Sequence, residues 1–219
     1  MKRLLEPEVM DTEAEAQEYD AMDFREVNSA FATDAIAIGP EKAAVLDTGT
    51  GTARIPILIA QQRPQWQITA IDLADSMLAI ARRNVAEAGL SRQITLAKVD
   101  SKELPYPDNS FDLVISNSIV HHIPDPLPYL REIKRVLRPQ GGIFLRDLLR
   151  PDDEATVERL VSAIGPEYSP HQAQLFRDSL CAAFTIPEIE ALLTAAGLGD
   201  VRVDQSSDRH WTARKNAGF

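Results

Sequence analysis

Three strand-like segments in this chain, one a short apolar run and two alternating, each end on an aspartate, and the spacing of these acids could build a binding site. The acids are Asp47, Asp72 and Asp100. Acids are depleted in strands, so three in this position indicate the same edge of one sheet. Asp72 follows the first glycine-rich turn by about 20 residues, where a carboxylate can accept hydrogen bonds from ribose hydroxyls. Taken alone, Asp72 could equally cap a turn.

Two glycines, Gly49 and Gly51, follow Asp47 directly and precede a helix expected to begin near Thr52 or Ala53. Glycine permits positive φ and lets a ligand approach the backbone without meeting a Cβ. A dinucleotide fingerprint would need glycine where Arg54 stands, and the chain has no Walker A sequence. A tight turn that binds no ligand would also explain the two glycines.

The remaining pattern, D-x-G-x-G-x-A, resembles the first motif of the class I S-adenosylmethionine (SAM)-dependent methyltransferases, which usually have a third glycine where this chain has Ala53. The later phrase LPYPDNSFDLVISNSIVHHIPDP closely resembles the fourth-motif region of small-molecule methyltransferases, including those of quinone biosynthesis. The resemblance covers roughly Ala43 to Leu145, about half of the chain, and its motifs agree in order and spacing.

This resemblance implies SAM as the cofactor and S-adenosylhomocysteine as the product. It implies that the glycines approach the methionine part of SAM, that Asp47 orients their loop or meets the ammonium through water, and that Asp72 holds the ribose. The cofactor-binding residues predicted in this way are Asp47, Gly49, Gly51, Asp72, Leu73, Asp100, Ser101 and Asn117. Leu73 would contact the adenine ring, and Asp100 and Ser101 its polar edge.

Adjacent histidines, His121 and His122, follow the fourth predicted strand and are the candidate catalytic residues. Histidine can transfer protons near neutral pH because its ordinary pKa is about 6.5. The family often has a polar residue at the second position, which favours His122, although either histidine could simply bond its own loop. We expect one to point inward and the other to solvent. Alternative acceptor contacts are Asn117, Ser118, Arg146, Tyr168 and His171.

No metal site is predicted, because neighbouring residues on a helix or strand do not share a face. The formal charge of −10 disfavours a nucleic-acid partner. No apolar run approaches the ~20 residues of a membrane span, and the first residues lack the apolar core of a signal peptide. The single cysteine, Cys181, fits a reducing compartment, so we expect a cytoplasmic protein.

Strand and helix patterns alternate along the chain, which predicts an α/β fold with helices on both faces of a doubly wound sheet. With the family resemblance, the expectation becomes a Rossmann-like sheet of seven mostly parallel strands, one of them antiparallel. Residues 1–40 are expected to form a helical lid of two helices separated near Asp23, and residues 41–219 the methyltransferase domain. We also expect a sharp turn at Arg138–Gly142 before a fifth strand, Ile143–Asp147, and a terminal hairpin around Ser207-Asp208.

The sequence therefore predicts a SAM-dependent methyltransferase that acts on a small molecule. Two other readings stay open: a SAM-binding regulatory or accessory protein without catalysis, and a dinucleotide enzyme of Rossmann type, which Arg54 disfavours. The acceptor, the methylated atom, the use of a general base and the oligomeric state are left open by the sequence.

Overall fold

Seven strands form one sheet in the order β3-β2-β1-β4-β5-β7-β6. The computed structural model describes residues 1–6, 11–22, 24–165 and 168–218. The strands are β1 (Ala43–Thr48), β2 (Trp66–Asp72), β3 (Ile94–Lys98), β4 (Phe111–Asn117), β5 (Leu137–Leu148), β6 (Arg202–Gln205) and β7 (His210–Lys215). The α-helices are α1 (Glu13–Ala21), α2 (Arg25–Ile38), α3 (Arg54–Gln62), α4 (Asp75–Glu87), α5 (Leu127–Val136), α6 (Glu154–Ser162), α7 (Pro170–Ala182) and α8 (Ile186–Ala195), with a short 3₁₀ helix, η1 (Val120–His122).

The sheet is doubly wound, with β1 and β4 side by side at its centre. β1 pairs in parallel with β2 and β4, and β4 pairs in parallel with β5. β7 runs antiparallel to both of its neighbours, β5 and β6. Chain order reverses between β1 and β4, and in such sheets ligands bind beside this point at the carboxyl ends of the strands. The predicted fold class is confirmed.

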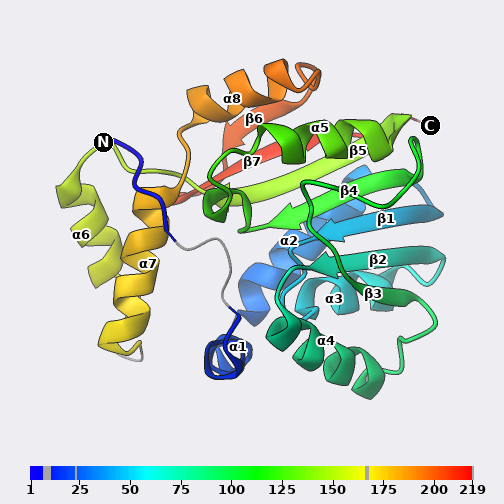
Figure 1. Cartoon of the computed structure of the whole chain (residues 1–219), viewed down its shortest axis with the longest axis horizontal. Helices are drawn as coiled ribbons and strands as arrows, with labels where there is room; N and C mark the ends of the chain where they lie inside the picture. The colour runs from blue at the N-terminus through cyan, green and yellow to red at the C-terminus, as the bar shows by residue number, and fades with distance from the viewer. Residues whose placement is uncertain (7–10, 23, 166–167, 219) are drawn as a thin grey trace.

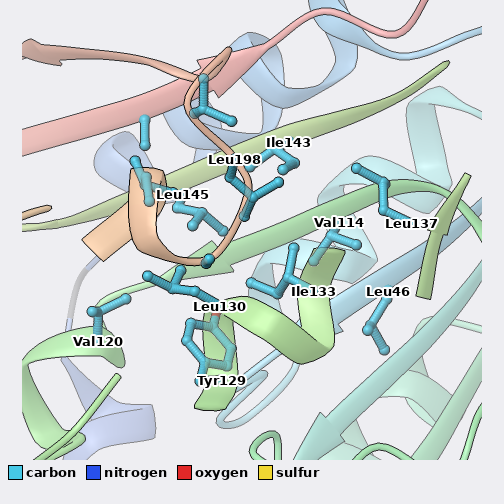
Figure 2. Packing of buried hydrophobic residues seen from close by; sticks show 14 of the residues in the cluster. Leu46, Val114, Val120, Tyr129, Leu130, Ile133, Leu137, Ile143, Leu145 and Leu198 are labelled. Atoms are coloured by element: carbon cyan, nitrogen blue, oxygen red, sulfur yellow. The ribbon is translucent and has the colours of Figure 1, made fainter. Parts of the chain in front are cut away.

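Helices cover both faces of the sheet (Figure 1), and a hydrophobic core lies beneath the helices on each face. On one face α5 turns Tyr129, Leu130 and Ile133 toward the strands, a spacing that places them on one side of the helix (Figure 2). Leu46 and Val114 meet them from β1 and β4. The other core lies beneath α2, α3 and α4. Both layers fix the ends of the central strands, where the candidate site is found.

The two N-terminal helices differ in how they pack. α2 contributes Phe31 and Ala32 to the second core, and the Phe31 ring meets Phe144 of β5 edge-on at 4.9 Å between centroids. α1 lies across the carboxyl end of the sheet and packs Ala16 against the start of α4. α1 ends at Ala21 and α2 begins at Arg25. Asp23, where the break between them was predicted, lies outside the described residues.

The first residues of the chain lie beside the insert formed by α6 and α7 (Figure 1). Leu4 donates its backbone N–H to the carbonyl of Cys181 in α7 at 3.0 Å, and Cys181 itself is a buried free thiol. Arg3 lies over the Phe184 ring, 3.7 Å from its centroid. The N-terminus is thereby brought close to the carboxyl end of the sheet. None of the helices among the described residues has the length and apolar character needed to cross a bilayer.

The predicted turn at Arg138–Gly142 is wrong, because these residues are the first part of β5. Leu137 pairs with Phe111, and the register shifts before Leu113 pairs with Gly142. Gly142 allows close packing within the sheet, since a Cβ there would lie 3.1 Å from both the Ala217 nitrogen and Leu113 Cδ1. Gly141 and Gly142 therefore allow β5 to continue through this shift in register. The terminal hairpin forms as predicted, from β6 and β7.

Candidate active site

The turn between β1 and α3 has the left-handed backbone that its glycines suggest. Gly49 has φ +70°, Gly51 has φ +54° and Ala53 has φ +63°. A Cβ on Gly49 would lie 1.9 Å from Ile119 Cγ2, so this position tolerates only glycine without a shift of the following loop. Ala53 holds the same conformation with a side chain, at a cost of about 1–2 kcal/mol. It occupies the place where the family usually has its third glycine.

Asp72 ties the end of β2 to this turn. Its carboxylate accepts the Gly51 N–H at 2.8 Å and the Ala74 N–H at 2.9 Å, one on each oxygen. Burial raises the pKa of the carboxyl, and the backbone N–H groups of Ala74, Gly51 and Leu73 oppose that shift. An ionised carboxylate has about four acceptor positions, so acceptor capacity remains for hydroxyl groups of a ligand.

A cavity of about 150 Å³ opens beside Asp72 at the carboxyl ends of β2, β3 and β4. Its lining includes the predicted residues Gly49, Gly51, Asp72, Leu73, Asp100, Ser101 and Asn117, together with Ser118 and His122. Asp100 accepts the Lys102 backbone N–H at 2.9 Å and pairs with the Lys102 ammonium at 3.2 Å. The predicted adenosine-binding residues are therefore brought together by the fold.

A second cavity, of about 600 Å³, lies on the other side of the glycine turn and is lined by α1, α2 and α3. It shares Tyr19, Gly49 and Asn117 with the first, so the two cavities meet at the end of β1. Asp47 lines the second cavity.

Asp47 is only 3% exposed, and its carboxylate Oδ2 has no hydrogen-bond partner among the described residues. Burial, with a smaller contribution from Asp72, raises the pKa of Asp47 to about 7; the Thr50 hydroxyl opposes the shift. A buried polar atom without a partner is costly, so a cationic ligand group beside Asp47 would stabilise it. This feature fits the ammonium group of SAM.

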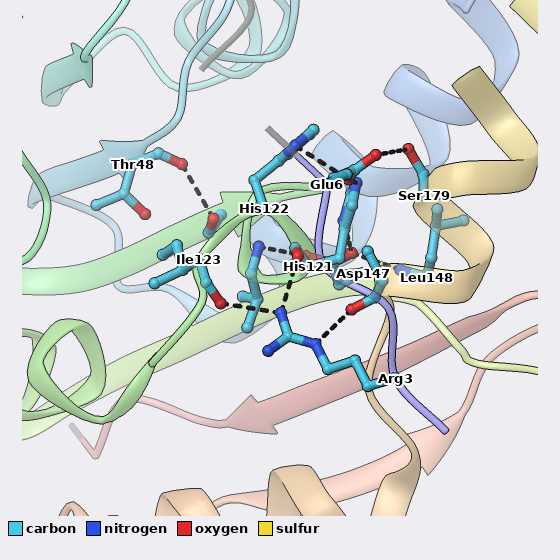
Figure 3. A network of polar contacts seen from close by, with 12 residues as sticks. Arg3, Glu6, Thr48, His121, His122, Ile123, Asp147, Leu148 and Ser179 are labelled. Carbon is cyan, nitrogen blue, oxygen red and sulfur yellow. Dashed lines mark hydrogen bonds and ion pairs between the residues drawn. The ribbon is translucent and has the colours of Figure 1, made fainter. Parts of the chain in front are cut away.

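The two histidines lie on η1, directly after β4, in a network anchored by Asp147 at the end of β5 (Figure 3). Asp147 accepts the Val120 N–H at 2.5 Å and pairs with His121 Nδ1. His121 is buried; burial disfavours its charged form, but Asp147 outweighs this and raises the pKa of His121. His122 is 21% exposed and lines the first cavity.

Glu6, from the start of the chain, completes this network. Its Oε1 lies 3.1 Å from His122 Nδ1 and 3.4 Å from His121 Nε2, and the two imidazole rings are 4.2 Å apart. The premise that adjacent histidines cannot converge is therefore wrong here. The tight turn of η1 tilts the rings 34° apart instead of projecting them to opposite faces. Glu6, His121 and His122 thus form a group of potential metal ligands that the sequence argument did not consider.

The alternative acceptor contacts are spread out. Arg146 bonds Thr212 Oγ1 at 3.0 Å and pairs with Asp34 at 2.7 Å, so it links β5, β7 and α2. His171 is exposed on α7, and Tyr168 precedes that helix. None of these three side chains lines either cavity.

Sequence reasoning missed three residues of the network: Arg3, Glu6 and Asp147. Arg3 donates hydrogen bonds to the carbonyls of His121 and Ile123, both at 2.9 Å, and so holds the loop after η1. Asp147 had a usable signal, because it stands at the end of a predicted strand like the other three acids. Arg3 and Glu6 had none, since their partners are more than a hundred residues away in sequence.

Known proteins resemble the part of the chain that carries these cavities. Residues 46–145 match the family described as "Methyltransferase domain". A demethylmenaquinone methyltransferase of Listeria monocytogenes is 38% identical over 109 residues, which are 49% of this chain and 46% of the relative. The match thus spans about half the length of that relative.

Solved structures extend the likeness to the whole fold. A SAM-dependent methyltransferase from Aquifex aeolicus has a TM-score of 0.69 at 19% identity, covering 95% of this chain and all of that one. A phosphoethanolamine N-methyltransferase of Haemonchus contortus, in complex with SAM, has a TM-score of 0.64 at 23% identity, covering 83% of this chain and 39% of that one. Residues 46–145 therefore match a methyltransferase domain, and the chain has the fold of these SAM-dependent methyltransferase structures.

Proposed function

We propose that the protein transfers a methyl group from SAM to a small-molecule acceptor. The observation that carries this proposal is the meeting of two cavities at Gly49 and Asn117, with carboxylates suited to opposite ends of one ligand. SAM has an adenosine on one side of its sulfonium and a cationic amino acid on the other. A single molecule across the junction would have its methyl group near Asn117.

The side chains fit this placement. Asp72 keeps acceptor capacity for the two ribose hydroxyls, beside Leu73 for the adenine ring. Asp100 and Ser101 border the far end of the first cavity, where the adenine edge would lie. Asp47 would hold the ammonium from the second cavity, directly or through water.

SAM supplies an electrophilic methyl group on a positively charged sulfur. The chain's task is to orient the acceptor in line with that group and to exclude water. Tyr19 of α1 borders both cavities, and Met22 and Phe24 border the second, so residues 1–40 would act as a lid on the domain formed by residues 41–219. Of this lid, α1 and the segment after it would cover the ligand, while α2 packs into the body of the protein.

His122 would orient the acceptor, or take its proton if the acceptor is a hydroxyl or another weak acid. It lies at the edge of the first cavity, beyond Asn117 and Ser118. His121 is buried against Asp147 and would act as a positioning residue. A demethylmenaquinone methyltransferase among the relatives makes a quinol a reasonable first acceptor to test.

The acidic charge supports a partner other than nucleic acid, and the single free cysteine supports a cytoplasmic location.

The test is transfer of isotope-labelled methyl groups from SAM to a short-chain demethylmenaquinol and to the small molecules of a cell extract, with mass spectrometry of the products. We expect a labelled small molecule and an equal amount of S-adenosylhomocysteine. Tight SAM binding without transfer to any small molecule would instead favour a non-catalytic, SAM-binding regulatory protein.

A further inference from the structure

The cluster of Glu6, His121 and His122 has the ligand set of a transition-metal site. Imidazole nitrogens and a carboxylate oxygen are the groups that zinc takes in many proteins. The three ligand atoms lie within 4.8 Å of one another. All three side chains are largely withdrawn from solvent: 8% of Glu6, 4% of His121 and 21% of His122 is exposed.

The distances from the Glu6 oxygen to the two histidine nitrogens fit tetrahedral coordination. Two ligands about 2.0–2.1 Å from a tetrahedral zinc ion are separated by about 3.3 Å. The Glu6 oxygen lies 3.1 Å from the His122 nitrogen and 3.4 Å from the His121 nitrogen. The oxygen is also buried, and no group among the described residues donates a hydrogen bond to it. A cation between these atoms would give that oxygen a direct partner.

Neighbouring polar residues hold the side chains of His121 and Glu6 in place, as neighbours of metal ligands usually do. Metal-bound histidines usually give their second nitrogen to a carboxylate, and metal-bound carboxylates are usually hydrogen-bonded themselves. Here the second nitrogen of His121 pairs with Asp147. The second oxygen of Glu6 accepts the Ser179 hydroxyl at 3.0 Å (Figure 3).

We propose that Glu6, His121 and His122 bind a divalent transition-metal ion, with zinc as the best fit, at the edge of the first cavity. The fourth ligand would be water, and a His122 bound in this way would orient the acceptor rather than take its proton. The ion would join the N-terminal segment to the loop between β4 and α5, two parts of the chain otherwise linked by the hydrogen bonds of Arg3. This proposal concerns metal binding alone and does not rest on the acceptor or on methyl transfer.

The test is a titration of untagged, chelator-treated full-length protein with Co²⁺, followed by the visible absorption of tetrahedral cobalt and then by displacement with Zn²⁺. We expect one cobalt ion per chain. The variants Glu6→Gln and His122→Gln should each weaken binding at least tenfold. His171→Gln is the matched control, because it removes an exposed histidine outside the cluster and should bind as the parent does.

Folding of each variant is checked by circular dichroism. If one variant fails to fold, the other is compared with the parent. Adding Zn²⁺ to the parent should also raise its melting temperature. Failure of the parent to bind cobalt would overturn the proposal and leave a protonated His121 shared between Asp147 and Glu6. Equal binding by the parent and a folded cluster variant would also overturn it.

Discussion

Replacing Asp47 by asparagine separates the cost of a buried carboxylate from its use in cofactor binding. The pKa of Asp47 is raised from 3.8 to about 7 in the folded protein, chiefly by burial. Each unit of difference from the unfolded chain corresponds to about 1.4 kcal/mol, so the ionised carboxylate destabilises the folded state by about 4 kcal/mol.

The sign of the pH dependence follows from the raised pKa. The folded protein holds this proton more tightly than the unfolded chain, so the associated stability is complete below about pH 4 and is lost as the pH rises through about 7. Asparagine does not titrate. The free energy of unfolding of Asp47→Asn, relative to the parent, should therefore rise by about 4 kcal/mol between about pH 4 and pH 8. Urea denaturation at both pH values measures this difference.

Cofactor binding should show the opposite preference. If the SAM ammonium needs an ionised Asp47, the SAM association constant of the parent should rise by up to about tenfold per pH unit below about pH 7 and then level off. In Asp47→Asn binding should be weaker at neutral pH, and this part of the pH dependence should vanish. Asp72 also has a raised pKa, but it is present in both proteins, so their difference reports Asp47. Calorimetric titrations that show the same pH slope in both proteins would refute the reasoning.

Three further changes probe the turn, the N-terminal segment and the histidine loop. Gly49→Ala should lower the melting temperature more than Gly51→Ala. The new Cβ at position 49 would lie 1.9 Å from Ile119, whereas at position 51 its nearest neighbour is a Tyr19 ring atom at 3.7 Å. Equal decreases in melting temperature would contradict this prediction. Arg3→Ala should cost about 1–3 kcal/mol in urea denaturation, because it removes charged hydrogen bonds to the loop after η1, and an unchanged midpoint would contradict it. His122→Gln should reduce turnover with SAM affinity retained, and full activity would move acceptor activation to another residue.

The alternation of strands and helices could be predicted because it depends on local patterns, whereas the seven-stranded sheet with one antiparallel strand followed from the family resemblance. The strand-like runs before Asp47, Asp72 and Asp100 indicate strands, and the acids mark a common edge. Asp72 and Asp100 line the first cavity at that edge, and Asp47 lines the adjoining second cavity. The start of β5 could not be predicted. A proline and two glycines normally favour a turn, but here pairing of Leu137 with Phe111 and the shift in register keep them in the strand.

The histidine network could be predicted only in part, because its members come from distant parts of the chain. His121 and His122 were recognisable from their motif, but their convergence depends on the turn of η1 and on Glu6. No local pattern connects residue 6 with residue 122. Long-range packing of the N-terminal segment against α7 decides that contact.

Calorimetric titration of S-adenosylhomocysteine into the parent protein and into Asp72→Ala tests the central claim most directly, because Asp72 joins the glycine turn to the proposed ribose site. Hydrogen bonds to a charged group contribute about 1.5–3 kcal/mol each, so the loss of two predicts at least tenfold weaker binding. The parent should bind one molecule per chain, and the variant should keep its circular dichroism spectrum. Unchanged affinity in a folded Asp72→Ala protein, or no binding by the parent, would contradict the placement of the cofactor at this edge of the sheet.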